Sequence, residues 1–411
     1  MNDTVRTLFS GRMLVALLMG FSSGLPLLLT GSVLQAWMTD EGVDLGTIGL
    51  FALVGLPYTL KFLWAPLVDR YALPLLGRRR GWLVLIQLCL VLAITLLGWT
   101  HPAQNAWPVA LAALLVTFFS ASQDIVIDAY RREALVDREL GLGASLYVNG
   151  YRVGMLLASG GGLILADFIP FSQVYALMAA VMVVGLGTTL FAPEPVAAQG
   201  LPATLSEAVI QPFVDYFKRH HAWLILLFIL LFKVGDTMAS NMTVPFYLDI
   251  GFSKTEIGTV VKFFGFTATL AGGLAGGIIM LRIGIYRALW GFGILQAVST
   301  AGFAVLALHG YSLPWLAAVI AFENFSGGMG TAAFVAFMAS LTNRRFTATQ
   351  YALLTSLMGI PRVILSAPTG YMAEGLGWVG FFVFCTLIAL PGLLLLTRFR
   401  GWLTEADARA D

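Results

Sequence analysis

Nine charged side chains stand inside long apolar segments of this sequence, away from the charged stretches that bound those segments. They are Lys61, Asp124, Asp128, Arg152, Lys233, Asp236, Lys262, Glu323 and Arg362. Each costs about 2.5–3.5 kcal/mol at the centre of a membrane-spanning helix, so such residues are expected where they pair with one another or bind a ligand. Five cations face four carboxylates, and this near balance indicates pairing inside a helix bundle.

The spacing of these residues predicts which of them share a surface. Asp124 and Asp128 are four residues apart, and Lys233 and Asp236 are three apart, so each pair lies on one face of a helix. At the rise of an α-helix, Lys61, Asp124 and Arg152 lie about 10–17 Å from the charged ends of their segments. We therefore expect these three side chains at one depth, with Asp124 paired to Arg152.

Two interpretations fit this pattern. The charges either form buried ion pairs that hold helices in register, or line a cavity where cations bind an anionic substrate and a carboxylate exchanges a proton. For the second interpretation the candidate proton-coupling residues are Asp124, Asp128, Asp236 and Glu323. The candidate substrate-binding cations are Lys61, Arg152, Lys233, Lys262 and Arg362. Asp128 is nearer the segment end, so a gating role is an alternative for it.

Other chemistry has little support in the sequence. No GxxxxGK[ST] loop and no HExxH motif occurs, and the four histidines lie in loops or at segment ends. Both cysteines, Cys89 and Cys385, lie within apolar runs, so neither a disulfide framework nor a cysteine metal site is expected. We predict no cofactor, no metal and no enzymatic activity. Aromatic residues such as Tyr151 are expected either to stack on a sugar ring or to pack between helices.

The elements that position these residues follow from composition. The 411 residues are 58% hydrophobic and 11% charged, whereas soluble domains carry about 25% charged residues. This excludes soluble enzymes, nucleic-acid binders and disulfide scaffolds. At about 20 residues per span, the chain has room for a dozen transmembrane helices.

Apolar runs bounded by charges predict twelve spans and no strands. They cover roughly 12–38, 46–69, 80–100, 106–131, 141–167, 172–193, 221–248, 254–281, 285–309, 312–343, 347–374 and 378–399. Residues 194–220 form a long polar linker, so we expect a six-helix bundle over 1–193, a second over 221–400, and a tail over 401–411. Within the linker, apolar residues from Leu205 to Phe217 recur at helical spacing, which predicts an amphipathic helix on the membrane surface.

The positions of lysine and arginine predict the orientation. Of the 24 such residues, five lie inside spans, eighteen lie on one side of the twelve-span arrangement, and only Lys254 lies on the other. The positive-inside rule then places both termini and the linker in the cytoplasm of a multi-pass inner-membrane protein.

The loop after the second span carries a recognisable pattern. It contains Asp69-Arg70, and then Gly77 followed by Arg78, Arg79 and Arg80. The pattern resembles the major facilitator signature, with an insertion between its two parts and no acidic counterpart in the second half. A simple cytoplasmic charge anchor is the alternative. Two six-helix halves with a site between them fit the major facilitator plan, and in that plan Asp69, Arg70, Arg78, Arg79 and Arg131 are candidate gating residues.

Longer segments make a more specific resemblance. They are GFSSGLPLLLTGSVLQAWM at 20–38, KFLWAPLVDRY at 61–71, GRRRGW at 77–82, SASQDIVIDAY at 120–130, GYRVGML at 150–156, FKVGDTMA at 232–239, FENFSGGMGTAAFVA at 322–336 and TATQYALL at 347–354. Together they resemble the AmpG muropeptide permeases, nearly from end to end. Longer members of that family carry further hydrophobic segments after the twelfth span, which we expect to be missing here.

The resemblance implies import of GlcNAc-1,6-anhydro-MurNAc, with or without its stem peptide, driven by the proton-motive force, with roles in wall recycling and β-lactamase induction. It implies muropeptide, protons and lipid as partners, no nucleic acid, and a monomer. Gln123 and Asn324 would then add polar contacts to the sugars. A transporter of another organic anion such as acetyl-CoA, or a polytopic protein that transports nothing, is the alternative.

Overall fold

The computed structural model describes residues 3–73, 76–196, 204–218, 222–253, 256–364 and 368–399, and every regular element in this part is helical. The contacts divide the chain into two compact units. Unit 1 comprises Met1–Val136, Leu146–Asp215 and Leu341–Ser356, and unit 2 comprises Asp137–Ser145, Tyr216–Ser340 and Leu357–Asp411. Each unit therefore combines most of one half of the chain with a short segment from the other.

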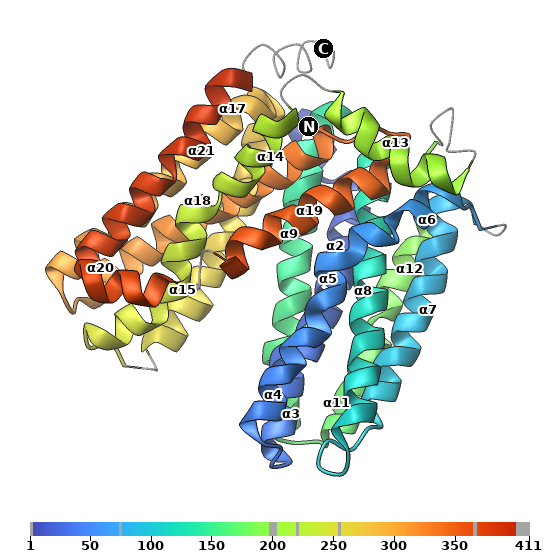
Figure 1. Ribbon diagram of the computed structural model, residues 1–411, viewed down its shortest axis with the longest axis horizontal. Helices are drawn as coiled ribbons and strands as arrows, with labels where there is room; N and C mark the ends of the chain where they lie inside the picture. Colours follow the sequence, from blue (N-terminus) through green and yellow to red (C-terminus); the bar gives the residue numbers. More distant parts are fainter. Residues whose placement is uncertain are drawn as a thin grey trace. The chain divides into compact units, whose positions relative to one another are not determined.

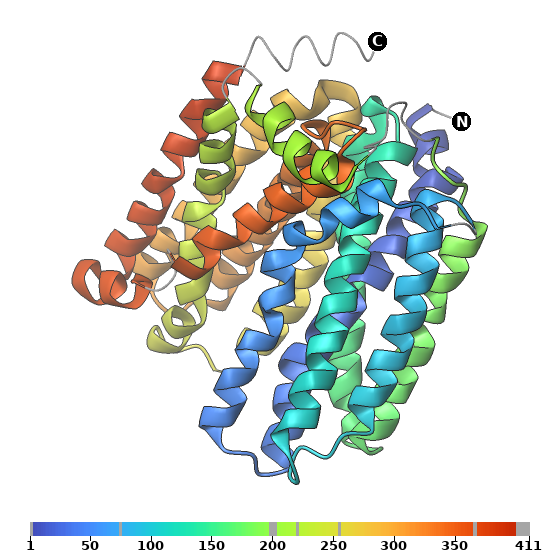
Figure 2. The same ribbon diagram turned by 45° about the vertical axis from the view of Figure 1, so that its right-hand side comes forward.

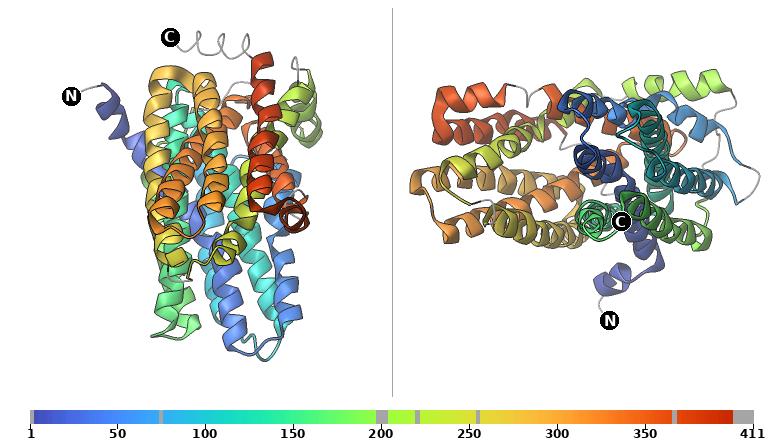
Figure 3. Two further views of the ribbon diagram at one scale, coloured as in Figure 1. Left: turned by 90° about the vertical axis from the view of Figure 1, so that its left-hand side faces the viewer. Right: turned by 90° about the horizontal axis from the view of Figure 1, so that it is seen from below.

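Unit 1 is a bundle of long helices interrupted by short irregular turns (Figure 1). Its helices are α1 (Asp3–Leu8), α2 (Gly11–Leu28), α3 (Leu34–Asp40), α4 (Leu45–Leu50), α5 (Leu56–Leu60), α6 (Ala65–Arg70), α7 (Arg78–Gly98), α8 (Ala106–Ala134), most of α9 (Leu140–Leu156), α10 (Gly162–Ala166), α11 (Phe171–Val181), α12 (Val183–Phe191), α13 (Leu205–Phe217) and the start of α19 (Thr347–Ile364). The right-hand panel of Figure 3 shows the blue-to-green helices of this bundle nearly end on.

Several of these helices continue one another through π or 3-10 turns. The π-turn Leu29–Val33 joins α2 to α3, the 3-10 turns Phe51–Gly55 and Lys61–Leu63 flank α5, and the π-turn Leu157–Gly161 joins α9 to α10. Such interruptions free backbone groups and re-aim side chains inside a long helix. Lys61 lies at one of them.

Small residues bring α2 and α9 into backbone contact. A Cβ atom added at Gly24 would lie 2.0 Å from the Tyr151 carbonyl oxygen, and one at Gly20 would lie 2.1 Å from that of Tyr147. Glycine is required where two helix backbones approach this closely. The approach places Ser23 of α2 beside Tyr147 of α9.

Unit 2 contains α14 (Ala222–Leu231), α15 (Val234–Asp249), α17 (Gly265–His309), α18 (Leu313–Ser340), the end of α19, α20 (Thr369–Ile388) and α21 (Leu390–Leu395), with a π-helical turn at Ile257–Phe264, and 3-10 turns at Asp137–Glu139 and Leu396–Phe399. Figure 2 shows α17 and α18, yellow to orange, running alongside each other. Gly272 allows this contact, because its Cβ would lie 2.0 Å from the Phe325 carbonyl oxygen. An aromatic core that includes Phe246, Phe303 and Phe382 packs α15, α17 and α20 together.

Two glycines turn the chain where sequence reasoning placed a loop between spans. Gly284 within α17 has φ 76° and ψ 168°, and Gly377 within α20 has φ 67° and ψ 167°. This left-handed backbone favours glycine. It divides each nominal helix into two segments, so within the described residues every one of the twelve predicted ranges contains helix.

Seven described helical stretches are long and apolar enough to cross a membrane. They are Gly11–Asp40, Arg78–Gly98, Ala106–Ala134, Phe171–Phe191, Ala222–Asp249, Ile257–His309 and Thr369–Arg398. Of the remaining predicted spans, 312–343 contains the unbroken 28-residue helix α18, which is less apolar, and the others are broken into shorter helices or contain residues outside the described part. The all-helical prediction is confirmed for the described residues.

The linker helix α13 is bound to protein through its polar side chains. Gln350 Nε2 donates to the Pro212 carbonyl oxygen (3.0 Å) and to Asp215 (2.9 Å), and Asn343 Nδ2 donates to Asp215 (3.2 Å). Arg345 also forms an ion pair with Glu207. Sequence reasoning predicted a helix on the membrane surface, whereas the structure supplies a specific protein partner, the segment that leads into α19.

Candidate functional site

The predicted loop signature forms a buried polar network in unit 1. Asp69 is fully buried, and its carboxylate accepts hydrogen bonds from the backbone N–H groups of Ala348 (3.2 Å) and Thr349 (2.8 Å) and from the Thr349 hydroxyl (2.8 Å). These groups belong to the first turn of α19. A carboxylate at a helix N-terminus satisfies orphan N–H donors and meets the positive end of the helix dipole.

Arg79 joins Asp69 to a second carboxylate. Its Nη2 atom lies 2.9 Å from Asp69 Oδ1, and its guanidinium donates to both oxygens of Glu133, at 3.0 Å and 2.6 Å. Its Nη1 donates to the Val68 carbonyl oxygen (3.1 Å), and the side chain is fully buried. Arg78 adds a contact of 2.8 Å to Glu133. The Arg79 guanidinium therefore makes four hydrogen bonds to two acids and a carbonyl oxygen, more than the three donors of a lysine could supply.

The N-terminus of α7 is held from another direction. The Glu194 carboxylate accepts from the backbone N–H groups of Arg79 (2.7 Å) and Arg80 (3.0 Å). Gly77, with φ 87°, leaves the space that this carboxylate occupies, since its Cβ would lie 2.7 Å from Glu194 Cδ. Of the five predicted gating residues, Asp69, Arg78 and Arg79 come together here. Arg70 instead stacks on the ring of Tyr71 at 5.3 Å.

The fifth predicted gating residue, Arg131, lies in a separate cluster of unit 1. Its Nη2 lies 3.2 Å from Asp128 Oδ1 and donates to the Tyr351 hydroxyl at 2.9 Å. Its guanidinium also stands 4.6 Å from the centre of the Tyr147 ring. Asp128 and Arg131 are both buried. Asp128 is thus paired with Arg131, a predicted gating residue, and gating is the alternative role that we predicted for Asp128.

Asp124 lies beside this pair but has different partners. Its carboxylate accepts a hydrogen bond from the Ser23 hydroxyl, which also contacts the Tyr147 hydroxyl at 3.2 Å. The charge that acts on Asp124 is that of Lys61, which also acts on Asp128. Lys61, which we also predicted at this depth, is buried at the 3-10 turn Lys61–Leu63, and the pairing of Asp124 with Arg152 stays a prediction.

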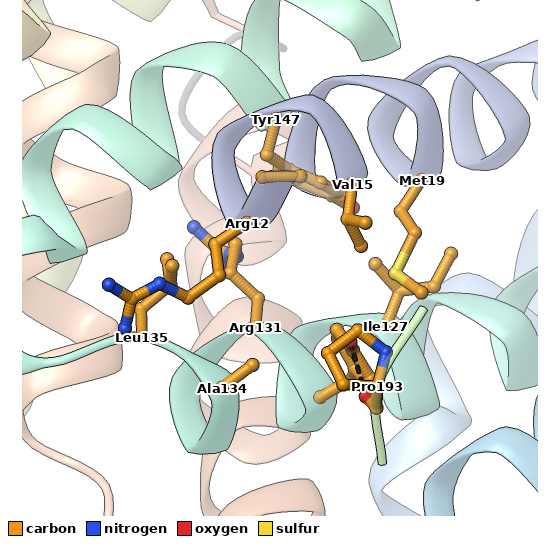
Figure 4. Close-up of a pocket in the computed structure, with 11 residues that line it drawn as sticks. Arg12, Val15, Met19, Ile127, Arg131, Ala134, Leu135, Tyr147 and Pro193 are labelled. Atoms are coloured by element: carbon orange, nitrogen blue, oxygen red, sulfur yellow. Dashed lines mark hydrogen bonds between the residues drawn. The ribbon is translucent and has the colours of Figure 1, made fainter. Parts of the chain in front are cut away.

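A small pocket opens beside Arg131, with an empty volume of about 340 Å³. Figure 4 shows Arg12 and Arg131 on one side of it, with Val15, Met19 and Ile127 on the other. The lining is mostly apolar. This pocket lies next to the cluster of Asp128 and Arg131 and does not include Lys61 or Asp124.

Unit 2 contains a second polar cluster. Lys233 Nζ lies 3.4 Å from Asp236 Oδ2 and donates to the Thr331 hydroxyl at 3.1 Å. Asp236 and Glu323 are close enough for their charges to act on each other, and the Ser299 hydroxyl donates to Glu323 Oε2 at 2.6 Å. Three of the charges predicted in this half therefore meet.

The remaining predicted site residues lie elsewhere. Gln123 is fully buried, with its Nε2 donating to the Ser22 carbonyl oxygen (3.0 Å), and Asn324 accepts from the Thr269 hydroxyl (2.9 Å) at the contact of α17 and α18. The Tyr151 ring lies 6.2 Å from that of Tyr147. The side chains of Lys262 and Arg362 are outside the described part of the structure.

Sequence reasoning missed the uncharged partners and two acids. Glu133, Glu194, Ser23, Tyr147, Tyr351, Ser299 and Thr331 all complete the networks above. A signal existed for Glu133, the single acid beside Arg131-Arg132 at a span end, and for the serines inside apolar segments. None existed for Tyr351, because its partner Arg131 is 220 residues away in sequence.

Comparison with known proteins decides the family. Residues 13–364 match the model of the Major Facilitator Superfamily. Over 388 residues the chain is 47% identical to the anhydromuropeptide permease of Escherichia coli strain K12, covering 94% of this chain and 79% of that protein. The chain belongs to the AmpG family of the Major Facilitator Superfamily. A putative transporter AmpG 4 of Rickettsia felis is 33% identical over 397 residues, covering 94% of this chain and 95% of that one.

Solved structures agree on the fold of this AmpG family member. The Escherichia coli fucose:proton symporter superposes with a TM-score of 0.73 at 10% identity, covering 96% of this chain and 99% of that one. The predicted major facilitator fold is therefore confirmed, and the chain is a multi-pass inner-membrane protein whose named relatives include permeases and transporters.

Proposed function

We propose that this protein imports anhydro-muropeptides from the periplasm into the cytoplasm by proton-coupled alternating access. The substrate would be GlcNAc-1,6-anhydro-MurNAc, with or without its stem peptide, destined for peptidoglycan recycling. The observation that carries the proposal is the 47% identity over 94% of the chain to a protein named as an anhydromuropeptide permease.

The residues of unit 1 suit such a substrate. It carries lactyl or peptide carboxylates at one end and two uncharged sugars at the other. Lys61 is buried, at 7% exposure, and no hydrogen bond or ion pair of its ammonium group is found among the described residues. A buried cation with unused donors is suited to bind a carboxylate that arrives with the substrate. Arg152 and Tyr151, also on α9 of unit 1, are proposed to extend this site.

The driving force is proposed to be the proton gradient. The sequence carries no nucleotide-binding loop, and unit 1 and unit 2 each hold two carboxyl groups within spans: Asp124 with Asp128, and Asp236 with Glu323. Carboxyl groups within membrane spans mark ion and proton pathways in transporters. The protein would act as a monomeric carrier and would catalyse no covalent change in its substrate.

The orientation remains the one that the positive residues predict. Both termini and residues 194–220 are proposed to be cytoplasmic, between a six-helix bundle over 1–193 and another over 221–400, with a tail over 401–411. Reporter fusions after Arg219 and after Arg400 should both report the cytosol. A periplasmic report at either position would refute this topology.

Uptake of labelled anhydro-disaccharide, with and without peptide, by cells lacking their own permease tests the function. Saturable accumulation should follow an imposed pH gradient in proteoliposomes without nucleotide. Lys61→Met should lower apparent affinity at least tenfold, whereas Lys218→Met, at an exposed position of the linker, should leave it unchanged. Accumulation of acetyl-CoA or another organic anion, but not of the disaccharide, would overturn the substrate assignment.

A further inference from the structure

The linker helix α13 has an apolar face that is open to its surroundings. Val209, Ile210 and Phe217 are 41%, 55% and 41% exposed. At 3.6 residues per turn these three side chains fall within about 100° of the helix circumference, and the partly buried Phe213 lies between them. Contact with water is unfavourable for such a surface. A continuous exposed apolar patch of this kind indicates a binding partner.

The opposite face of α13 is fixed to unit 1. Pro212 lies on that face and is buried, and its carbonyl oxygen accepts a hydrogen bond from Gln350 of α19 at 3.0 Å. Gln350, which is also buried, donates to Asp215 as well, at 2.9 Å. Glu207 forms an ion pair with Arg345. Rotation of α13 about its axis would break these contacts, so its apolar face points in a set direction.

The same contacts set the level of α13 in unit 1. Gln350 follows Thr349, whose N–H and hydroxyl groups bind the Asp69 carboxylate. Asp69 in turn pairs with Arg79, the second residue of α7, an apolar helix of 21 residues that is long enough to cross a membrane. Figure 1 shows α13 at this end of unit 1, running across the ends of the long helices. The helix therefore lies where a span begins, which is the level of the membrane surface.

The apolar face also continues into a membrane span along the chain. The centres of the Phe217 and Trp223 rings are 4.8 Å apart. Trp223 is 72% exposed and is the second residue of α14, with which the candidate span Ala222–Asp249 begins. Tryptophan favours the boundary between lipid and water, where its ring contacts apolar groups and its N–H remains hydrated. The face of α13 is thus continuous with a surface that lipid covers.

We propose that α13 binds the lipid surface with its apolar face while its polar face holds the start of α19. A helix that is apolar on one side and polar on the other lies in the plane of the membrane, with its apolar side chains at the boundary of headgroups and acyl chains. In α13 the polar side chains face protein, where they bind Gln350 and Arg345. One helix therefore contacts the lipid and the protein at the same time.

This arrangement makes α13 a strap between the membrane and α19. Helix α19 belongs to unit 1 as far as Ser356 and to unit 2 from Leu357 onward, so a strap at its start acts on an element that both units share. Loss of the lipid contact is expected to loosen the start of α19. The lipid contact does not depend on the proposed function, whereas its effect on transport does.

Spin labels on α13 test the lipid contact. Ile210→Cys and Gln211→Cys are labelled in the full-length protein, whose own cysteines are replaced by Cys89→Ser and Cys385→Ala, and each is reconstituted into phospholipid vesicles. Gln211 is the matched control, because it is exposed on the same helix and points about 100° away from Ile210. The Ile210 label should collide with dissolved oxygen and lose its collisions with a water-soluble nickel chelate. The Gln211 label should collide with the chelate.

Two results overturn the proposal. Equal access of the nickel chelate to both labels would show that the apolar face lies in water. An Ile210 label that is shielded from both oxygen and the chelate would show that protein covers this face. If the cysteine-free parent does not fold, the same labels are placed in the native chain, and the signal of its own cysteines, of which Cys385 is buried, is subtracted.

A charge on the apolar face tests the strap. Ile210→Asp should raise the mobility of a spin label at Arg344→Cys, an exposed position just before α19, whereas Gln211→Asp should leave that mobility unchanged. Ile210→Asp should also slow uptake of the anhydro-disaccharide, with Gln211→Asp close to wild type. Unchanged mobility at Arg344 in Ile210→Asp would overturn the strap. A protein that shows both label patterns and moves no muropeptide would refute the proposed function alone.

Discussion

The polar networks of the two units differ in how their charges are matched. In unit 1, Lys61 and Arg131 act on Asp124 and Asp128, so two cations serve two acids. In unit 2, among the side chains that the structure describes, Lys233 is the one cation that acts on Asp236 and Glu323. A network with equal numbers of cations and acids can stay ionised and hold helices in place. A network with more acids than cations needs a mobile charge to become neutral.

The depth of the two clusters differs as well. Asp128 is six residues from Ala134, about 9 Å from that end of α8, while Glu323 is ten residues from Leu313, about 15 Å from the nearer end of α18. In the cluster of Asp128 and Arg131, Arg131 also donates a hydrogen bond to the Tyr351 hydroxyl of α19. The comparison suggests positioning and gating for the first cluster and proton exchange for the second.

The largest expected loss of stability comes from removing a cation that is paired with buried acids. Arg79→Leu leaves Asp69 and Glu133 buried without their shared guanidinium, and breaking such a pair costs about 3–5 kcal/mol. We expect a large loss of folded protein and a lower thermal unfolding temperature in detergent. Arg79→Lys should recover only part of the loss, since one ammonium group cannot bridge both carboxylates.

Arg70 provides the matched control, because it belongs to the same signature loop. Its guanidinium stacks on Tyr71, a contact worth about 0.5–1 kcal/mol at an exposed site. Arg70→Leu should therefore change the unfolding temperature little. If Arg70→Leu and Arg79→Leu lowered the unfolding temperature equally, the loop would need only positive charge. The pairing of Arg79 with Asp69 and Glu133 would then not explain the stability of unit 1.

The sequence predicted the charged residues of these networks better than their pairing. Asp69, Asp124, Asp236 and Glu323 could be identified from the sequence alone, because a charged residue within or at the end of an apolar segment stands out there and is energetically costly in a membrane. The partners were harder to find. Depth placed both Lys61 and Arg152 beside Asp124, and the charge of Lys61 does act on Asp124. The pairing with Arg152 stays a prediction, because depth does not fix rotation about the helix axis.

The fold was predictable for a related reason. Twelve apolar segments and one polar linker are one-dimensional patterns, and the turns at Gly284 and Gly377 fall between predicted spans. The docking of α13 on Asn343 and Gln350 was not predictable, because its polar contacts join residues that are 128 to 138 positions apart.

An intermediate loss of stability is expected at two glycines, one in each unit, that allow close contact between helix backbones. Gly24→Ala in unit 1 and Gly272→Ala in unit 2 would each place a Cβ 2.0 Å from a backbone carbonyl oxygen, of Tyr151 and Phe325 respectively. Neither backbone atom can rotate away, so overpacking should cost about 1–3 kcal/mol. Gly24→Ala should also disturb the Ser23–Asp124 contact, whereas Gly272→Ala should leave that contact intact.

Glycines without neighbours serve as controls for this pair. Gly187 in α12 and Gly291 in α17 have no atom within 4 Å of an added Cβ. Alanine there should be neutral or should stabilise by up to about 1 kcal/mol, because it favours helix over glycine. Thermal unfolding of all four variants measures the difference. If Gly24→Ala and Gly272→Ala unfold like the controls, the close helix contacts do not support either network.

The smallest effect is expected at Glu256, a partly exposed carboxylate of unit 2. Glu256 accepts from the Tyr311 hydroxyl (2.6 Å) and from Ser253, by its N–H (2.8 Å) and its hydroxyl (2.9 Å). The Tyr311 hydrogen bond, with those from Ser253, lowers the pKa of Glu256, and the Glu256 carboxylate raises the pKa of Tyr311.

The sign of the pH dependence follows from these two directions. A lowered acid pKa stabilises the folded protein above the unfolded pKa of Glu256, and this contribution is lost as pH falls through its folded value. The raised Tyr311 pKa adds a contribution that is lost as pH rises through the folded value of that hydroxyl. Tyr311→Phe should therefore lower the unfolding temperature slightly near neutral pH, and the gap from wild type should narrow toward acid. A gap that is constant with pH would show that Tyr311 stabilises only by its stacking on Phe252, whose ring centre lies 4.8 Å away. In that case the Glu256 carboxylate would make no proton-dependent contribution to the stability of the folded protein.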